Sequence, residues 1–155
     1  GGRFKKLVVI DSRPYMLLIR DEGFEPNEEF AKWVDVVMYV FSVENEDSFQ
    51  SVSRYYHKIS KYRNPANIPS ILVGTTDTVN PHNPRVVDVK RAKTIVQRCA
   101  GFCTYVETHA MCGNNVNRVF NIACQVAIRH SSLINCSHAN VGFSKRRSSI
   151  FCEVA

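Results

Sequence analysis

Two apolar runs stand out along the chain, one over 36–41 and one within 70–73, where Ile71, Leu72 and Val73 follow Ser70. An apolar run of this length predicts a strand that is buried on both faces of a sheet. Between the two runs, Phe49, Val52 and Ile59 recur at helical spacing together with tyrosines, which predicts an amphipathic helix of about four turns. Asn45 precedes this helix as a candidate cap. The middle of the chain therefore alternates strand, helix and strand.

The beginning of the chain predicts a β-hairpin. Residues 4–10 and 15–19 are rich in apolar side chains and are separated by a short turn at 11–14. Two strands joined by so short a turn run antiparallel. An acidic loop with Gly and Pro follows, and the spacing of apolar residues over 28–33 predicts a short helix.

The second half of the chain continues the alternation of strands and helices. Asp88 is a candidate cap for a short helix, residues 104–106 predict a strand, and a helix follows the turn at 113–115. The pattern then fades, so we expect one domain over 1–130 and a basic, Ser-rich, disordered tail over 131–155. Strict alternation predicts an α/β fold in which a mostly parallel sheet with one antiparallel edge hairpin is covered by helices on both faces.

The candidate chemistry lies just after the run at 70–73. Gly74 is expected to turn the chain into a loop of small polar residues that displays Asp77. Ligands of open parallel sheets bind past the carboxyl ends of the strands, and a carboxylate there accepts two hydrogen bonds from a ligand with two adjacent N–H groups, such as guanine. Asp also caps turns through its own local hydrogen bonds. Both interpretations of Asp77 are open from this stretch.

Composition and charge restrict the class of protein. The chain has 155 residues, of which 45% are hydrophobic, so one domain with a substantial core is expected. The net charge is +6, and the densest basic run, 145–147, lacks the interleaved aromatic residues typical of nucleic-acid binding. We therefore expect no nucleic-acid partner and interpret this run as a solvated linker, with a kinase site or an acidic-lipid contact as alternatives.

Cysteine spacing and hydropathy indicate the compartment. None of the six cysteines forms a C-x-x-C pair, which favours free thiols in a reducing environment. No signal peptide is recognised, and no apolar stretch approaches the roughly 18 residues of a membrane span. The sequence therefore predicts a cytoplasmic protein. Because the first residue is Gly1 rather than Met, we also expect the chain to be a fragment.

Further segments match a known pattern. Asp21 follows the second predicted strand, Gly74-Thr75-Thr76-Asp77 the fourth, and Glu107-Thr108-His109-Ala110 the fifth. This order resembles a Ras-like small GTPase. A narrower resemblance, over about residues 1–130, is to the GTPase-like domain of the centaurin-gamma (AGAP) family of Arf GAPs. The segments that carry it are Gly2-Arg3-Phe4-Lys5-Lys6, Leu17-Leu18-Ile19-Arg20-Asp21-Glu22-Gly23, Trp33-Val34-Asp35, Val40-Phe41-Ser42-Val43-Glu44-Asn45-Glu46, Asn83-Pro84-Arg85-Val86 and Asn115-Val116-Asn117-Arg118-Val119-Phe120.

The resemblance implies a guanine-nucleotide site. Asp77 would accept hydrogen bonds from the edge of the guanine ring, and the Ala110 amide would meet the guanine oxygen. In the motif after the fourth strand, Thr75 stands where the family usually has Asn. In the motif after the fifth strand, His109 stands where the family usually has Ser. Asp21 would hold magnesium through a water. The cofactors implied are GTP or GDP and Mg²⁺, provided that an upstream P-loop is supplied.

Departures from the family pattern weaken the case for catalysis. The sequence contains no P-loop of the form G-x-x-x-x-G-K-[ST], which would lie upstream of Gly1 together with a first strand and a first helix. In the family's D-x-x-G motif, Gly would be expected at position 24, where this chain has Phe24. The residue that orients the attacking water would come next, and Glu25 stands there. Phosphoryl transfer depends on positioning and charge stabilisation, so we expect weak or absent hydrolysis.

The missing first strand also has a structural consequence. In a Ras-like sheet it would lie between the strands predicted at 15–19 and 36–41. Without it both neighbours would have unpaired edges, and each buried unpaired backbone group costs about 1–3 kcal/mol. We therefore expect this chain on its own to be unstable or to aggregate.

Three functional hypotheses follow from the sequence. The first is a guanine-nucleotide-binding GTPase-like domain of an Arf GTPase-activating protein, whose other domains would act on Arf GTPases and phosphoinositide membranes. The second is a nucleotide-independent protein-interaction pseudoGTPase module, favoured by Phe24, Glu25, Thr76 and His109. The third is a non-functional fragment. Whether the domain hydrolyses GTP is left open.

Overall fold

The computed structural model describes residues 2–21, 25–137 and 149–154, and the side chains of those up to residue 132. The elements alternate between strands and helices after an initial pair of strands, as the sequence predicts. In chain order they are β1 (Gly2–Ile10), β2 (Arg13–Asp21), α1 (Glu28–Trp33), β3 (Val36–Ser42), α2 (Glu46–Ser60), a 3₁₀ turn (Pro65–Asn67), β4 (Ser70–Thr75), α3 (Val89–Arg98), β5 (Phe102–Thr108), α4 (Val116–Ser137) and β6 (Ser149–Val154).

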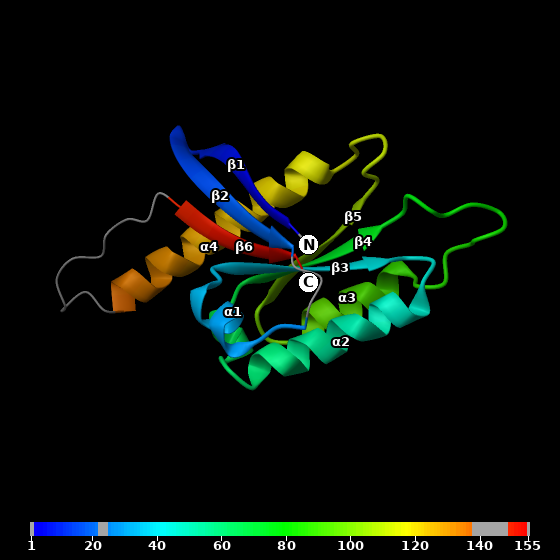
Figure 1. Cartoon of the computed structure of the whole chain (residues 1–155), viewed down its shortest axis with the longest axis horizontal. Coiled ribbons are helices and arrows are strands. Elements are labelled where there is room, and N and C mark those ends of the chain that lie inside the picture. Colours follow the sequence, from blue (N-terminus) through cyan, green and yellow to red (C-terminus); the bar gives the residue numbers. More distant parts are fainter. Residues whose placement is uncertain (1, 22–24, 138–148, 155) are drawn as a thin grey trace.

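The strands form a single six-stranded sheet in the order β1-β2-β6-β3-β4-β5. β1 pairs antiparallel with β2 at one edge, and all other neighbours pair parallel. Figure 1 shows the sheet with α4 on one side and α1, α2 and α3 on the other. The predicted α/β fold with a parallel sheet and an antiparallel edge hairpin is therefore confirmed.

The last strand occupies the middle of the sheet. Residues 149–153 of β6 lie opposite 16–20 of β2, and residues 152–154 lie opposite 36–38 of β3. The expectation that β2 and β3 would have unpaired edges is therefore wrong for residues 16–20 of β2 and 36–38 of β3, where β6 lies between the two strands. Of the tail expected to be disordered over 131–155, the structure continues α4 to Ser137 and forms β6 from 149 to 154; residues 138–148 and 155 lie outside the described residues.

Two apolar clusters fill the spaces on either side of the sheet. On the face covered by α4, Val119, Ala123 and Ala127 are buried against the strands. The opposite face buries Phe49, Val52 and Ile59 of α2, with α1 and α3 beside them. Burial of these two faces provides most of the driving force that holds such a three-layer arrangement.

Helix caps are placed as the sequence predicts. The side-chain oxygen of Asn45 accepts a hydrogen bond from the Ser48 amide at 3.0 Å, and Asp88 accepts one from the Arg91 amide at 2.8 Å. Each satisfies a backbone donor that the first turn of the helix leaves without an intrahelical partner. These caps determine where the two helices begin and how far each preceding loop extends.

Gly74 does not turn the chain, contrary to the sequence-based expectation. β4 continues through Gly74 to Thr75, and the loop begins at Thr76. A Cβ atom at position 74 would lie 2.5 Å from the hydroxyl of Tyr105 and 3.0 Å from Val43. Glycine is required here because the neighbouring strand places an aromatic side chain against the backbone.

Candidate functional site

The carboxyl ends of β4 and β5 lie side by side and carry the predicted site residues. Thr75 is in register with Thr108 across the two strands. Beyond them, the amide of Thr76 donates to the Thr108 carbonyl at 3.0 Å, and its hydroxyl donates to the same oxygen at 3.2 Å. These bonds hold the loop after β4 against the loop after β5.

Asp77 is bound to the loop that follows β5. Its Oδ1 accepts a hydrogen bond from the Met111 amide at 2.9 Å and lies 3.2 Å from Nδ1 of His109. The amides of Met111 and Ala110 hold the pKa of Asp77 below its usual value, so the group is a carboxylate at neutral pH. This hydrogen bond joins two loops that are 34 positions apart in the sequence, which differs from the local turn capping that Asp residues often provide. It places Asp77 beside the loop that carries Ala110.

The loop after β5 is compact. His109 and Asn114 exchange two backbone hydrogen bonds of 3.1 and 3.0 Å, and the Gly113 amide donates to the Ala110 carbonyl at 3.1 Å. Gly113 and Asn115 have positive φ values of 74° and 61°, which Gly and Asn adopt more readily than other residues. The loop thus holds the amides of 110 and 111 in place around Asp77.

Thr75 ties the site to β3. Its hydroxyl lies 3.1 Å from the hydroxyl of Ser42 and 3.3 Å from the carbonyl of Phe41. A Thr hydroxyl has one donor and two acceptor lone pairs. It can therefore donate to the Phe41 carbonyl and accept from the Ser42 hydroxyl at the same time. Thr75 therefore joins the ends of β3 and β4 beneath the loop that carries Asp77.

An ion pair that the sequence pattern does not predict lies near the carboxyl end of β5, next to the loop that carries Ala110. Arg85 donates two hydrogen bonds of 2.7 Å to the carboxylate of Glu107, which also accepts one from the Tyr105 hydroxyl at 2.8 Å. Arg85 chiefly, and Tyr105 with it, lowers the pKa of Glu107. Both charged residues lie in segments that the sequence resemblance quotes, but their separation by twenty-two positions gives no sign that they pair.

The remaining predicted residues lie apart from this cluster. Asp21 is exposed at the end of β2, with β6 and β3 between β2 and β4 in the sheet. Within the described ranges, no group of three or more His, Cys, Asp or Glu side chains is placed to hold a metal ion. Glu25 forms a 2.7 Å ion pair with Lys58 of α2, and Phe24 lies outside the described residues.

Comparison with known proteins identifies the family. The sequence profile of the Ras family matches residues 5–129. The chain belongs to the Ras family. Among similar proteins are "Ras-related protein RABG3f" of Arabidopsis thaliana, 29% identical over 132 residues, "Ras-related protein Ral-a" of Drosophila melanogaster, 32% identical over 102 residues, and human "GTP-binding protein RAD", 24% identical over 157 aligned positions.

This Ras-family chain aligns with only part of each relative. The matches cover 80%, 66% and 96% of the chain, and 63%, 45% and 49% of RABG3f, Ral-a and RAD. The chain therefore spans about half to two thirds of the length of these curated relatives. In the described part of the chain, none of the helices combines the length and hydropathy needed to cross a bilayer.

Proposed function

We propose that this Ras-family domain binds a guanine nucleotide at the loops after β4 and β5. Asp77 accepts hydrogen bonds from the two N–H groups on the guanine edge, and the Ala110 amide donates to the guanine oxygen. The observation that carries the proposal is the placement of the ionised Asp77 carboxylate against the loop of Ala110 and Met111. Adenine would leave this carboxylate without matching donors, which is the basis of discrimination.

The chemistry of Asp77 fits such a ligand. A carboxylate has two oxygens with about four lone-pair sites, so the bond from Met111 leaves acceptor capacity for the base. The Ala110 amide, which acts on Asp77 in the present structure, would turn toward the guanine oxygen on binding. His109 lies beside Asp77, at the position where the usual motif has the smaller Ser.

The sequence offers fewer groups to bind the phosphates of the nucleotide than to bind the guanine base. We propose that GTP or GDP with Mg²⁺ is the nucleotide species and that Asp21 holds magnesium through a water. The printed sequence contains no G-x-x-x-x-G-K-[ST] segment, and Glu25 is paired with Lys58 rather than left to orient a water. Hydrolysis by this chain is therefore proposed to be weak or absent.

The parent protein and its partners rest on the narrower sequence resemblance. We propose that the domain is part of a cytoplasmic Arf GAP of the centaurin-gamma type, whose other domains act on Arf GTPases and phosphoinositide membranes. The support for this assignment is the set of segments that carries the resemblance, including Trp33-Val34-Asp35 and the segment that begins at Asn115. The Ras-family assignment does not depend on it.

Two contacts favour a second function. Asp77 already accepts a hydrogen bond from the loop after β5, and Glu25 is already paired with Lys58 of α2. A domain with both groups used internally could act as a nucleotide-independent protein-interaction module. This alternative requires only the fold, so it predicts that nucleotide changes neither the thermal stability nor the partner binding of the domain.

Nucleotide titration separates the two functions. The chain is mixed with fluorescent GDP and, separately, with fluorescent ADP at equal concentrations of Mg²⁺, and binding is followed by anisotropy. The guanine-site proposal predicts saturable binding of GDP that Asp77→Ala weakens, whereas the matched variant Asp47→Ala, at an exposed acid on α2, leaves it unchanged. Equal binding of GDP and ADP, or no saturable binding, would contradict the proposal and favour the interaction module.

A further inference from the structure

His109 lies directly against the carboxylate that is proposed to bind guanine. It follows β5 at the start of the loop that carries Ala110, and its Nδ1 is 3.2 Å from Oδ1 of Asp77. Two backbone hydrogen bonds between His109 and Asn114 fix the backbone at this position. The side chain of His109, in contrast, is 36% exposed. The imidazole can therefore turn toward solvent while the loop stays in place.

The contact between His109 and Asp77 is close but incomplete. Nδ1 of His109 is shielded from solvent, yet it forms no aligned hydrogen bond within the part of the chain that the structure describes. A shielded polar atom without such a bond lowers stability. The Met111 amide, by comparison, donates to the same Asp77 oxygen at 2.9 Å. The imidazole is therefore held against Asp77 less firmly than the amide is.

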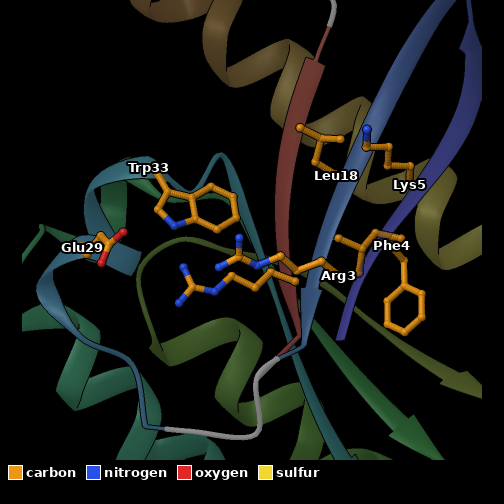
Figure 2. A pocket seen from close by; sticks show the side chains of 8 residues that line it. Arg3, Phe4, Lys5, Leu18, Glu29 and Trp33 are labelled. Carbon is orange, nitrogen blue, oxygen red and sulfur yellow. The ribbon is translucent and has the colours of Figure 1, made fainter. Parts of the chain in front are cut away.

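The side chains around the pocket between the β1–β2 hairpin and α1 differ from His109 in this respect. Figure 2 shows Arg3 reaching from the hairpin toward Trp33 across this pocket, whose volume is about 340 Å³. The guanidinium carbon of Arg20 lies 5.5 Å from the centre of the Trp33 ring, and Glu153 of β6 is in register with Arg20. Because Arg3, Arg20 and Trp33 all take part in interactions within the chain, these groups are already engaged.

Guanine and the imidazole compete for the same oxygen of Asp77. A carboxylate oxygen has about two lone-pair sites, and Oδ1 already faces the Met111 amide and Nδ1 of His109. A base with two adjacent N–H groups needs one site on each oxygen of the carboxylate. One of the two nitrogens must therefore leave Oδ1. The amide belongs to a loop that is closed by backbone hydrogen bonds, so the imidazole is the group that is displaced.

The charge of the imidazole changes the strength of this competition. Histidine side chains typically change charge between pH 5 and 8, and an imidazolium beside a carboxylate is an ion pair that a base must break. Asp77 faces His109 from the loop after β4, and the thiol of Cys112 contacts the His109 carbonyl from the same loop. The amides of Met111 and Ala110 hold the pKa of Asp77 below its usual value, so the carboxylate stays charged over this range.

We propose that His109 controls the affinity of the domain for guanine, because it occupies Asp77 until the base displaces it; the proposal rests on the guanine site described under the proposed function. The neutral imidazole leaves Asp77 readily and weakens guanine binding only slightly. The imidazolium holds Asp77 as an ion pair and weakens guanine binding more. Affinity for guanine therefore falls as the pH is lowered, and this fall depends on one side chain.

Binding of fluorescent GDP at two pH values tests this role of His109. Anisotropy titrations at pH 7.5 and pH 5.5, with equal Mg²⁺, give the dissociation constants of the whole parent chain and of His109→Ser. We expect His109→Ser to bind about twofold to fivefold more tightly at pH 7.5, as loss of a partly exposed charged contact implies, and to exceed the parent by a larger factor at pH 5.5. The phosphates of GDP also gain protons over this range, but they do so with both chains, so the ratio of the two dissociation constants isolates His109.

Two further variants separate the charge of His109 from its hydrogen bonding and from general effects of removing a histidine. His109→Asn retains an N–H donor but cannot become charged, so its affinity should stay near that of the parent at pH 7.5 and should lose the additional weakening at pH 5.5. His57→Ser removes an exposed histidine near the end of α2 and should leave GDP binding unchanged at both pH values. Thermal melts of each variant at both pH values check that the fold is retained.

The outcomes distinguish the role of His109 from the guanine site itself. Tighter binding by His109→Ser, with a gap that widens at pH 5.5, supports the role. Equal binding of GDP by the parent and His109→Ser at both pH values would overturn the role of His109 and leave the guanine site intact. A ratio that is the same at both pH values would also overturn it, because the charge of the ring would then have no effect. If neither chain bound GDP saturably, the guanine site would fail, and the role of His109 would fail with it.

Discussion

At the scale of single residues, Asp77 illustrates how one side chain supports both a structural and a functional role. Its carboxylate caps the loop after β5 through the Met111 amide, and the same loop carries the amide proposed to meet guanine. A group that is fixed by a neighbouring loop is already oriented before a ligand arrives, so less conformational freedom is lost on binding. The cap and the ligand site are therefore compatible uses of the same carboxylate.

The Asp77→Asn variant tests the direction of the proposed hydrogen bonds. Asn presents an NH₂ donor in place of a carboxylate oxygen, so it should disfavour the amino group of guanine and favour xanthine, which has an oxygen there. We expect GDP binding to weaken by about tenfold to a hundredfold and xanthosine diphosphate binding to improve. Competition against a fluorescent nucleotide measures both. If the variant weakens both nucleotides equally, Asp77 acts only as a structural cap.

The Gly74→Ala variant tests the close contact between β4 and β5. The added methyl group would collide with the Tyr105 hydroxyl, and overpacking of this kind costs about 1–3 kcal/mol. We expect a lower unfolding midpoint in urea, and partial recovery when Tyr105→Phe removes the hydroxyl in the same chain. The Tyr105→Phe single variant completes the double-mutant cycle. Additive effects of the two substitutions would show that the contact does not explain the glycine.

At the scale of elements, charged pairs connect segments that the apolar core does not join. Arg85 lies in the loop before α3, and Glu107 lies on β5 directly ahead of the predicted guanine loop. Their paired hydrogen bonds, with that of Tyr105, hold the end of β5 against the loop that leads to α3. Rigid support of this kind determines how well a loop maintains the position of its functional groups.

The ion pair between Arg85 and Glu107 predicts a pH dependence of stability. Because the hydrogen bonds from Arg85 lower the pKa of Glu107 in the folded state below its usual value of 4.5, its contribution to stability is present above about pH 4.5 and is lost as the pH falls further. Glu107→Gln should therefore reduce the unfolding free energy by about 1 kcal/mol at pH 7, since the pair is partly exposed, and by less at pH 3.5. Urea unfolding at both pH values checks this. An equal difference at both would contradict the assignment.

At the scale of the whole molecule, the position of β6 determines whether the sheet is continuous. The strand comes from the end of the chain, yet it lies between β2 and β3 and pairs with both. It thereby joins the β1–β2 hairpin to the parallel part of the sheet. The apolar cluster beneath α4 contains residues from both parts, including Val8, Leu17 and Val36, so the continuity of the sheet also keeps this core closed.

Cys152→Pro tests the contribution of β6 to the whole fold. Position 152 lies opposite both Ile19 and Val36, and proline removes the backbone N–H that a central strand needs. Loss of one ladder bond in a buried sheet costs about 1–3 kcal/mol, so we expect the thermal midpoint to fall by roughly 5 °C and amide exchange in β2 and β3 to accelerate.

Cys152→Ser is the matched control because it retains the backbone N–H. If proline and serine at this position had the same thermal midpoint as the parent chain, β6 would not contribute to the stability of the folded protein. If both lowered it equally, the side chain rather than the strand pairing would be responsible. The full chain itself is expected to unfold in one cooperative transition, since β6 pairs with both the hairpin and β3.

The sequence by itself determined the local features of this protein. Apolar runs predict β3 and β4 because a strand buried on both faces needs apolar side chains at every position, and Asn45 and Asp88 predict helix starts because their side chains cap the first turn. These features depend on interactions between residues that are close in the sequence or on a repeating pattern. Asp77 and Ala110 were indicated as a pair by the resemblance to Ras-like proteins.

Only the tertiary structure decided which distant segments meet. β6 pairs with strands more than one hundred positions earlier, and its backbone hydrogen bonds carry no signal in residue type, so the sequence indicated a disordered tail instead. Three other features also join residues that are distant in the sequence. They are the pairing of Arg85 with Glu107, the contact of Tyr105 with Gly74, and the pocket between the β1–β2 hairpin and Trp33. They arise from the way the sheet and helices pack in three dimensions, which no local pattern of residues encodes.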